Sequence, residues 1–346
     1  MLKKTVISIF LILMFVGVYI AYDLYQQVYQ PNVTLKNTAD PYFYIHSDND
    51  FNDVVHNLYE KGYIINRETF EFVAEKKSGF KTNIHPGKYK LKEGMSNNEL
   101  VDLLRSGTTI PVQVTFNNVR TKEDLAGKIA KNLECDSASF LALLNDNNFV
   151  KNYGFNTTTI LTLFLPNTYQ FNWATTAEEA IQRMATEYKK FWTAERKSKA
   201  QKLNLTQSEV AILASIVQAE QTVHNNEKPK VAGLYINRLR KGMMLQSDPT
   251  LVYGLGNFKI RRVLNKHKAI DSPYNTYKHK GLPPGPINLP NKKSLDAVLD
   301  YEQHGYIFMC AKEDFSGYHN FSKNYQQHLT YAKKYQQALN KRRIYQ

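Results

Sequence analysis

Glu220 is the residue of this chain whose type and setting point most directly to chemistry. Leu213, Ile216 and Val217 precede it at i, i+3 and i+4, and Glu220 follows at i+7 on the same predicted helix face. A carboxyl group among apolar neighbours resists ionisation, so we expect its pKa to be raised. A carboxylic acid that keeps its proton near neutral pH can donate it as a general acid.

The alternative is a structural glutamate whose carboxylate reaches solvent at the helix end, since most perturbed carboxylates are structural. The helix that carries Glu220 should begin at Thr206, because Thr206 and Glu209 have the spacing of a capping box. A second helix is predicted over 231–239. The stretch 247–290 is rich in Gly, Pro, Tyr and Asn, which is typical of loops that carry function on a rigid scaffold.

Longer motifs surround these elements. They read FLPNTY (164–169), LASIVQAE (213–220), KVAGLYINRLRKGMMLQSDPTLVYG (230–254), YNTY (274–277), GLPPGPI (281–287) and HNFSKNYQQH (319–328). Together they cover most of residues 160–330, and through them the chain resembles the endolytic murein transglycosylases, the MltG or YceG-like family. The essential glutamate of that family matches Glu220.

Two positions depart from the family pattern. Many members have a second Glu where this chain has Gln218, so Glu220 is the only acid in the motif. Asn167 stands where the family usually has Asp, which weakens a catalytic role for that position.

The resemblance implies a peptidoglycan lytic transglycosylase, a lyase that cuts within nascent glycan strands. It would cleave the β-1,4 bond between N-acetylmuramic acid and N-acetylglucosamine. Glu220 would protonate the glycosidic oxygen and then, as a carboxylate, accept the proton of the muramyl C6 hydroxyl, leaving a 1,6-anhydromuramic end. One carboxyl group suffices, because the attacking hydroxyl belongs to the substrate, whereas hydrolysis usually needs two. No cofactor is expected.

The alternative function is a non-catalytic, membrane-anchored scaffold that binds peptidoglycan. A binding protein needs no acid on an apolar helix face, so Glu220 argues against it. In either case the implied partners are peptidoglycan glycan strands, together with peptidoglycan polymerases or penicillin-binding proteins.

Eight further residues are candidates for substrate binding: Asn237, Gln246, Asp248, Thr250, Tyr253, Asn275, Tyr277 and His319. Each has a structural alternative. The amides could satisfy buried backbone groups, and the aspartate could form a local turn. The tyrosines, in a chain with 23 of them, could pack in the core, as could the histidine. The sequence contains no HExxH motif and no Cys/His cluster, so we expect no metal site.

The N-terminus predicts a membrane anchor. Residues 5–22 form an uncharged apolar run that is just long enough to cross a bilayer, and the residues at 19–21 make a poor signal-peptide cleavage site. Lys3 and Lys4 precede the run, and no Lys or Arg follows before Lys36. The positive-inside rule then predicts a single-pass protein of the cytoplasmic (inner) membrane, with its N-terminus in the cytoplasm and its domains extracytoplasmic or periplasmic.

The formal net charge of +14 admits several interpretations. In an extracytoplasmic chain we do not expect a nucleic-acid partner. A basic surface could attract anionic lipid headgroups or the carboxylates of peptidoglycan stem peptides, or could simply be solvated. Cys135 and Cys310 match no metal or redox spacing, and we expect two free, buried thiols.

The predicted fold class is α+β, with a LysM-like α/β subdomain and a mixed α+β catalytic domain. Tyr89 and Leu91 alternate as on a half-buried strand, and Ser96 and Glu99 form a second capping box, as in the LysM-like part of the family. The expected domains are a cytoplasmic N-terminus (1–4), an anchor (5–22), a linker (23–40), the LysM-like subdomain (41–109), a mixed α/β connecting region (110–172) and the catalytic domain (173–346).

Overall fold

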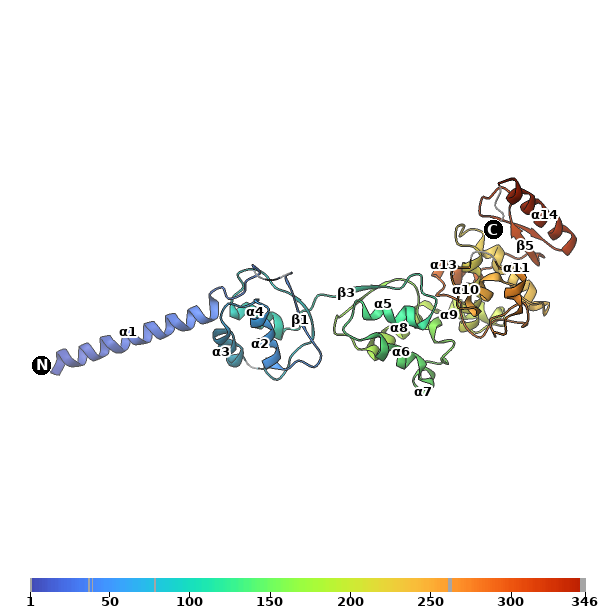
Figure 1. Ribbon diagram of the computed structural model, residues 1–346. Helices are drawn as coiled ribbons and strands as arrows, with labels where there is room; N and C mark the ends of the chain where they lie inside the picture. The colour runs from blue at the N-terminus through green and yellow to red at the C-terminus, as the bar shows by residue number, and fades with distance from the viewer. Residues whose placement is uncertain (1, 37, 39, 78, 261–262, 343–346) are drawn as a thin grey trace. The chain divides into compact units, whose positions relative to one another are not determined.

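The computed structural model describes residues 2–36, 38, 40–77, 79–260 and 263–342, and its mixture of helices and short strands confirms the α+β class. The chain forms two compact units, whose elements can be followed in Figure 1. Unit 1 comprises Met1–Gln113, Asn132–Cys135 and Gln170–Thr176. Unit 2 comprises Val114–Lys131, Asp136–Tyr169 and Ala177–Gln346.

Helix α1 (Leu2–Tyr29) opens unit 1. Its segment Lys4–Tyr29 is long and apolar enough to cross a membrane, and large side chains such as Phe15, which is 69% exposed, are not covered by protein. This fits the predicted single-pass anchor. The helix continues past the apolar run into the predicted linker, where the Gln27 carbonyl accepts a hydrogen bond from the Asn97 amide.

The rest of unit 1 is a two-stranded sheet packed with three helices. The antiparallel strands β1 (Tyr42–Ile45) and β2 (Gly87–Lys90) place Phe43 opposite Tyr89. The helices are α2 (Phe51–Glu60), α3 (Arg67–Lys76) and α4 (Asn97–Arg105). The predicted capping box of Ser96 and Glu99 is confirmed at the start of α4. The likeness of this unit to LysM domains stays a prediction.

The first part of unit 2 is mainly helical. Strands β3 (Val112–Thr115) and β4 (Thr168–Phe171) form a two-stranded sheet whose residues are divided between unit 1 and unit 2. The helices here are α5 (Lys122–Ala130), α6 (Ser137–Asn145), α7 (Asn147–Lys151), the 3₁₀ helix η1 (Ile160–Leu163) and α8 (Ala177–Phe191). The aromatic rings of Phe116, Phe140 and Phe164 pack together in the core between these elements.

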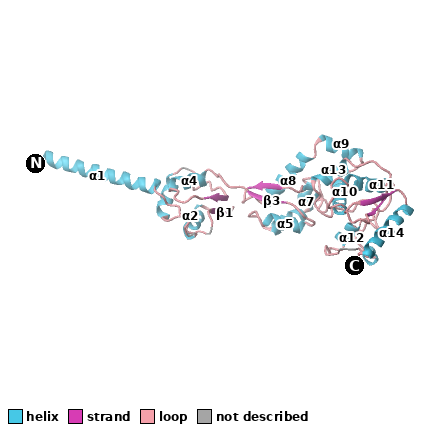
Figure 2. Cartoon of the chain, turned by 90° about the horizontal axis from the view of Figure 1, so that it is seen from above, coloured by secondary structure: helices cyan, strands magenta, loops and turns pink. Residues whose placement is uncertain are grey.

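Helix α10 (Gln207–Glu220) is the central helix of unit 2. Every residue from Val210 to Val217 is buried, which requires neighbours on all sides. Figure 2 shows α10 grouped with α11 and α13. The other elements of this part are α9 (Ala194–Lys202), α11 (Lys228–Arg240), α12 (Asp248–Gly254), the 3₁₀ helix η2 (Asn265–Ala269) and α13 (Lys292–Leu299). The predicted capping box at Thr206 is confirmed.

A hairpin and a final helix complete unit 2. Strands β5 (Phe308–Ala311) and β6 (His319–Ser322) are antiparallel, and α14 (Tyr325–Lys341) packs against them. Cys310 lies on β5. Both Cys310 and Cys135 are of intermediate exposure rather than buried, so the prediction of buried thiols is wrong: short strands and loops at the surface cover them only in part.

Candidate active site

Glu220 is the last residue of α10, at the point where this buried helix ends and a loop that reaches the surface begins. The residue as a whole is of intermediate exposure, whereas its carboxyl group is surrounded by protein. The residues from Val210 to Val217 are buried, and Leu213, Ile216 and Val217 are inaccessible to solvent. The predicted apolar setting of Glu220 is therefore present.

Two hydroxyl groups hold one oxygen of this carboxyl. Tyr235 of α11 donates to Oε1 over 2.7 Å, and Ser247, just before α12, donates to the same atom over 2.6 Å. In a protonated carboxyl group the carbonyl oxygen is the better acceptor. Two donors on Oε1 therefore assign the carbonyl to Oε1 and leave the acidic proton on Oε2.

The pKa of Glu220 is raised, and burial is the main cause. The hydrogen bonds from Ser247 and Tyr235 act the other way, because they stabilise the carboxylate. The negative charge of Asp248 adds to the rise, whereas a positive charge on His319 would lower the pKa. Together these effects favour a carboxylic acid that keeps its proton at pH values where an ordinary glutamate is ionised.

Asp248 lies at the first turn of α12, beside Ser247. Its Oδ1 accepts a hydrogen bond of 2.6 Å from the Tyr277 hydroxyl. Burial and this bond together raise the pKa of Tyr277. The structure thus brings together two of the predicted site residues, Asp248 and Tyr277, within the electrostatic reach of Glu220.

Thr250 and Gln246 shape the loop that carries Ser247. The Thr250 hydroxyl is fully buried and donates to the Ser247 carbonyl over 2.7 Å. Gln246 adopts the left-handed backbone conformation, with φ of 53°, and its Oε1 accepts from the Arg238 guanidinium over 2.5 Å. These contacts favour a role in holding the loop over direct binding.

The asparagine amides at 237 and 275 are occupied by backbone groups. Asn237 donates to the carbonyls of His304 and Tyr306, at 2.7 and 3.0 Å. Asn275, which is fully buried, donates to the carbonyls of Lys268 and Ile270, at 3.0 and 2.9 Å. Both amides therefore fit the structural alternative, in which they satisfy buried backbone groups instead of binding sugar.

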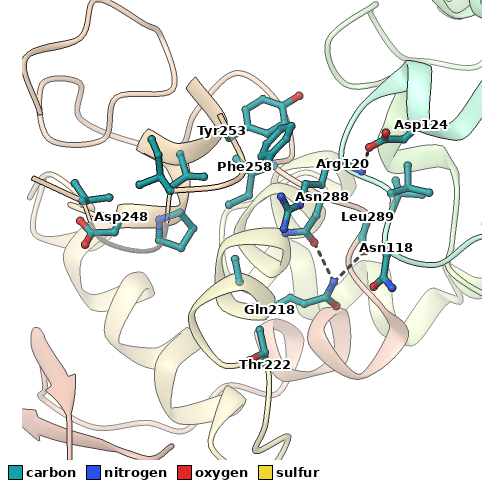
Figure 3. A pocket seen from close by; sticks show the side chains of 17 residues that line it. Asn118, Arg120, Asp124, Gln218, Thr222, Asp248, Tyr253, Phe258, Asn288 and Leu289 are labelled. Atoms are coloured by element: carbon teal, nitrogen blue, oxygen red, sulfur yellow. Dashed lines mark hydrogen bonds between the residues drawn. The ribbon is translucent and has the colours of Figure 1, made fainter. Parts of the chain in front are cut away.

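A cavity of about 820 Å³ lies beside the C-terminal turn of α10 (Figure 3). Gln218 and Ala219 line it, directly before Glu220 in the chain. The remaining lining comes from four stretches of unit 2, namely Asn118, Val119, Arg120, Asp124, Thr222, Asp248, Pro249, Val252, Tyr253, Phe258, Ile260, Val263, Ile287, Asn288 and Leu289. The Gln218 amide is fixed in the wall, because it donates to Asn288 Oδ1 and to the Leu289 carbonyl, at 3.0 and 3.1 Å. A volume of this size can hold more than one sugar ring.

Aromatic rings form one wall of this cavity. The ring of Tyr253 packs at 4.6 Å from that of Tyr274 and at 6.2 Å from that of Phe258. The guanidinium of Arg120 lies 4.6 Å from the Phe258 ring, on the same side (Figure 3). Of the predicted tyrosines, Tyr253 is the one that lines the cavity.

His319 begins β6 and is bound to Glu227, the residue before α11. Glu227 Oε2 lies 2.8 Å from His319 Nδ1, and Glu227 Oε1 accepts from the His319 backbone N–H over 2.9 Å. His319 is thus held firmly near Glu220 rather than free in the cavity. In the described ranges, no group of three or more His, Cys, Asp or Glu is arranged to hold a metal ion.

Sequence reasoning missed several residues that the structure adds to the site: Ser247, Tyr235, Glu227, Arg120 and Phe258. Ser247 and Tyr235 lie inside the 230–254 motif, so they could have been chosen as candidates from that motif. Arg120 and Phe258 lie outside every motif, and only the fold brings them to the cavity.

Known proteins are similar to this chain over most of its length. Residues 43–334 match the YceG-like family. A protein of Bacillus subtilis (strain 168) named endolytic murein transglycosylase is 30% identical over 296 residues, which cover 81% of this chain and 80% of that protein. A protein of the same name from Streptococcus pneumoniae (strain R6) is 28% identical over 277 residues, or 70% of this chain, which spans only 49% of the streptococcal protein.

A solved structure gives the same answer for the fold. The crystal structure of a putative yceG-like protein from Listeria monocytogenes aligns with a TM-score of 0.56 and 27% sequence identity, covering 84% of this chain and 97% of the other. The family match spans both the site and the greater part of unit 1. The chain therefore belongs to the YceG-like family.

Proposed function

We propose that this protein is a lytic transglycosylase that cuts peptidoglycan glycan strands internally. The observation that carries the proposal is the setting of Glu220: a buried carboxyl with a raised pKa, two donors on one oxygen and a large cavity alongside. The names of the Bacillus and Streptococcus relatives support the same activity. The bond cut would be the β-1,4 linkage between N-acetylmuramic acid and N-acetylglucosamine.

In the first step Glu220 acts as the acid. Tyr235 and Ser247 occupy Oε1, so the proton leaves from Oε2 to the glycosidic oxygen as the bond from that oxygen to C1 of the muramyl sugar breaks. The carboxylate that forms is stabilised by the same two donors, because hydrogen bonds to a charged acceptor are the stronger ones. Proton donation is thereby coupled to a strengthening of contacts that already exist.

In the second step the Glu220 carboxylate acts as the base. It accepts the proton of the muramyl C6 hydroxyl as that oxygen bonds to C1, which closes the 1,6-anhydro ring and returns the acid to its starting state. The nucleophile belongs to the substrate, so no ordered water and no second carboxylate are required. Asp248, whose Oδ1 is bound by Tyr277, would act on Glu220 through its charge.

The glycan strand would lie in the cavity beside α10. Tyr253 contributes an aromatic ring to the lining, and the side chains of Asn118 and Arg120 would supply polar groups for hydroxyl and N-acetyl groups. The Gln218 amide is bonded to Asn288, Leu289, Asn291 and Ser294, so it would shape the wall instead of binding the sugar. Thr250, Gln246, Asn237 and Asn275 would support the loops rather than touch the sugar.

The membrane anchor suits a substrate made at the membrane. We propose a single-pass topology with the N-terminus in the cytoplasm and both units outside, close to peptidoglycan polymerases. Cutting within murein strands accords with the names of the relatives, and the action on nascent strands at the membrane is part of the proposal.

The test is a digestion by the purified full-length chain in detergent. Uncross-linked glycan strands are incubated with the wild-type protein and with Glu220→Gln, and the products are analysed by mass spectrometry. We expect 1,6-anhydromuramic ends from the wild type and a loss of about 10² to 10⁴ in rate for the variant, as for removal of a general acid. Reducing ends would indicate hydrolysis, and undegraded strands would support the alternative, a peptidoglycan-binding scaffold. Wild-type turnover by Glu220→Gln would refute the mechanism.

A further inference from the structure

Arg120 brings a positive charge to the wall of the cavity beside α10, and the acid–base steps do not use that charge. The residue lies in the loop between β3 and α5. Among the described residues that line this cavity it is the one basic residue, and the lining also contains two acids, Asp124 and Asp248. A cation in the lining with no task in the reaction indicates a role in recognising charge on the ligand.

The loop that carries Arg120 is fixed by backbone contacts. Asn118 adopts the left-handed conformation, with φ of 49°, and Val119 is 1% exposed. The Val119 carbonyl accepts a hydrogen bond of 2.9 Å from the Leu289 N–H, which joins the loop to another part of the cavity lining. The Arg120 N–H donates to Asp124 Oδ2 over 3.0 Å. The Arg120 side chain therefore extends from backbone that is already ordered.

An aromatic ring restrains the guanidinium and leaves its hydrogen-bond donors available. The central carbon of the group lies 4.6 Å from the centre of the Phe258 ring, a cation–π contact. In the described part of the chain, the Arg120 side chain donates to no acceptor and pairs with no carboxylate. The N–H groups lie in the guanidinium plane, where a carboxylate can accept two of them at once.

The two acids of the lining have other partners. Asp124 Oδ2 accepts from the N–H groups of Arg120 and Thr121, at 3.0 and 3.2 Å, in the first turn of α5, where the helix dipole favours a negative charge. Asp248 Oδ1 accepts from the Tyr277 hydroxyl. Figure 3 shows Asp248 on the other side of the cavity from Arg120. An anionic group of a ligand would therefore be repelled near Asp248 and attracted near Arg120.

We propose that Arg120 is a specificity-determining residue, which binds a carboxylate on the branch that a muramyl sugar carries at O3. This inference rests on the proposed function, because that function makes muramyl sugars the ligand. The lactyl branch of N-acetylmuramic acid ends in a carboxylate or in a stem peptide that bears carboxylates, whereas N-acetylglucosamine carries neither. An arginine can thus distinguish peptidoglycan from an uncharged glycan such as chitin, which contacts to hydroxyl and N-acetyl groups alone do not.

The expected effect is on binding rather than on the chemical step. A contact to the branch exists in the bound substrate and in the transition state alike, so its loss raises Kd and KM and leaves kcat nearly unchanged. We expect removal of the guanidinium to weaken binding about tenfold, as for loss of a hydrogen bond between charged groups at an accessible site.

The test measures Kd for labelled, uncross-linked strands with the full-length chain in detergent. All proteins carry Glu220→Gln so that the strands stay intact, and Arg120→Gln is compared with Arg120. The strands either bear stem peptides or have been stripped of them by an amidase, which leaves the lactyl carboxylates. Each kind is used with free carboxylates and after their conversion to amides.

We expect Arg120→Gln to weaken binding of strands with free carboxylates about tenfold and to leave binding of the amidated strands unchanged. Amidation should in turn weaken binding to the protein that keeps Arg120 by the same factor, and this arm needs no variant at position 120. An effect confined to strands with stems assigns the carboxylate to the stem peptide, and an effect on stripped strands assigns it to the lactyl group.

Arg240→Gln is the matched control. Arg240 of α11 also lies over an aromatic ring, 5.4 Å from the centre of Tyr301, but it does not line this cavity. Its replacement changes the net charge by the same amount and should leave every Kd unchanged. An equal loss in Arg240→Gln would show general attraction by a basic protein and overturn the inference.

Two further results would overturn it: an equal loss on free and amidated strands, which would mean that Arg120 binds neutral groups, and an unchanged Kd throughout. Cleavage by the wild-type chain, run in parallel, separates the two proposals. If the wild type cuts strands and Kd is insensitive to Arg120, the inference fails alone. If the wild type cuts no strand, the proposed function fails, whereas turnover by Glu220→Gln refutes its mechanism, and KM then replaces Kd in the comparison.

Discussion

At Glu220, burial and hydrogen bonding act on the carboxyl group in opposite directions. Burial destabilises the carboxylate, whereas hydrogen bonds from the hydroxyls of Tyr235 and Ser247 stabilise it. The effect of burial is the larger, so the pKa is raised. An acid that must also become a base needs both influences. Without burial it would be ionised before the substrate arrived, and without the donors its carboxylate would be too unstable to form.

Ser247→Ala tests the donor side of this balance. The change removes the 2.6 Å bond to Oε1, which matters most when Glu220 is a carboxylate, so we expect kcat to fall about a hundredfold with little change in KM. Steady-state kinetics on glycan strands measure both constants. Ser208→Ala, which removes a hydroxyl of α10 that lies 3.2 Å from the Thr162 hydroxyl of η1, is the matched control and should keep the wild-type kcat. A raised KM with normal kcat would instead make Ser247 a substrate-binding residue.

Glu220→Gln tests the burial side through stability. Because the pKa in the folded state is raised above that in the unfolded chain, the wild type is destabilised as pH rises from the unfolded value of about 4.3 through the folded pKa. Glutamine does not titrate, so the variant does not lose stability in this way. We expect the difference in melting temperature, variant minus wild type, to be larger at about pH 7.5 than at about pH 4. Thermal unfolding at both pH values measures this, and a constant or shrinking difference would show that Glu220 is solvated or paired with a cation.

The helices of both units were predictable where their signals are local. The capping boxes at Thr206 and Ser96 each lie within three residues of their partners, and the buried face of α10 follows from its spacing. The contacts that complete the site are of another kind. Tyr235 and Ser247 lie 15 and 27 residues from Glu220, and only the packing of α10, α11 and α12 brings them to it.

The loops between the helices explain why the expected binding residues divide into two groups. The stretch around η2 has few helix or strand partners for its backbone, so polar side chains satisfy its carbonyls instead. The sequence cannot distinguish an amide that binds backbone from one that binds sugar, since both require the same donor. Tyr253 and Asp248 line the cavity, whereas Asn275 and Asn237 are turned to the chain itself.

Asn275→Ala tests this division. Removing the amide leaves the carbonyls of Lys268 and Ile270 and the Tyr277 N–H without their partner, so we expect the free energy of unfolding to fall by about 2 kcal/mol or more. Chemical denaturation measures the change. Asn257→Ala, at an exposed position of the same loop region, should stay within about 0.5 kcal/mol of wild type. A variant of normal stability with a raised KM would mean that Asn275 binds the substrate.

The chain combines a helix long and apolar enough to cross a membrane with two compact units, and the residues of the candidate site lie in unit 2. We expect deletion of residues 1–22 to yield a soluble protein that still produces anhydro ends from glycan strands in vitro, because none of those residues belongs to the site. Membrane flotation and mass spectrometry measure the two properties. A folded but inactive product would make the anchor part of the catalytic machinery, and a product that still floats with membranes would reveal a second attachment.

Helix α1 does not stop where its apolar run stops. Its last turns pack on α3 and α4, where Val28 contacts the core of unit 1 and the Gln27 carbonyl binds Asn97 over 2.9 Å. A spanning helix tilts until its apolar length matches the bilayer. Since the helix enters unit 1 without a flexible joint, such a tilt would turn the folded part of unit 1 with it. The thickness of the bilayer would then determine the angle at which the folded part of unit 1 faces the membrane surface.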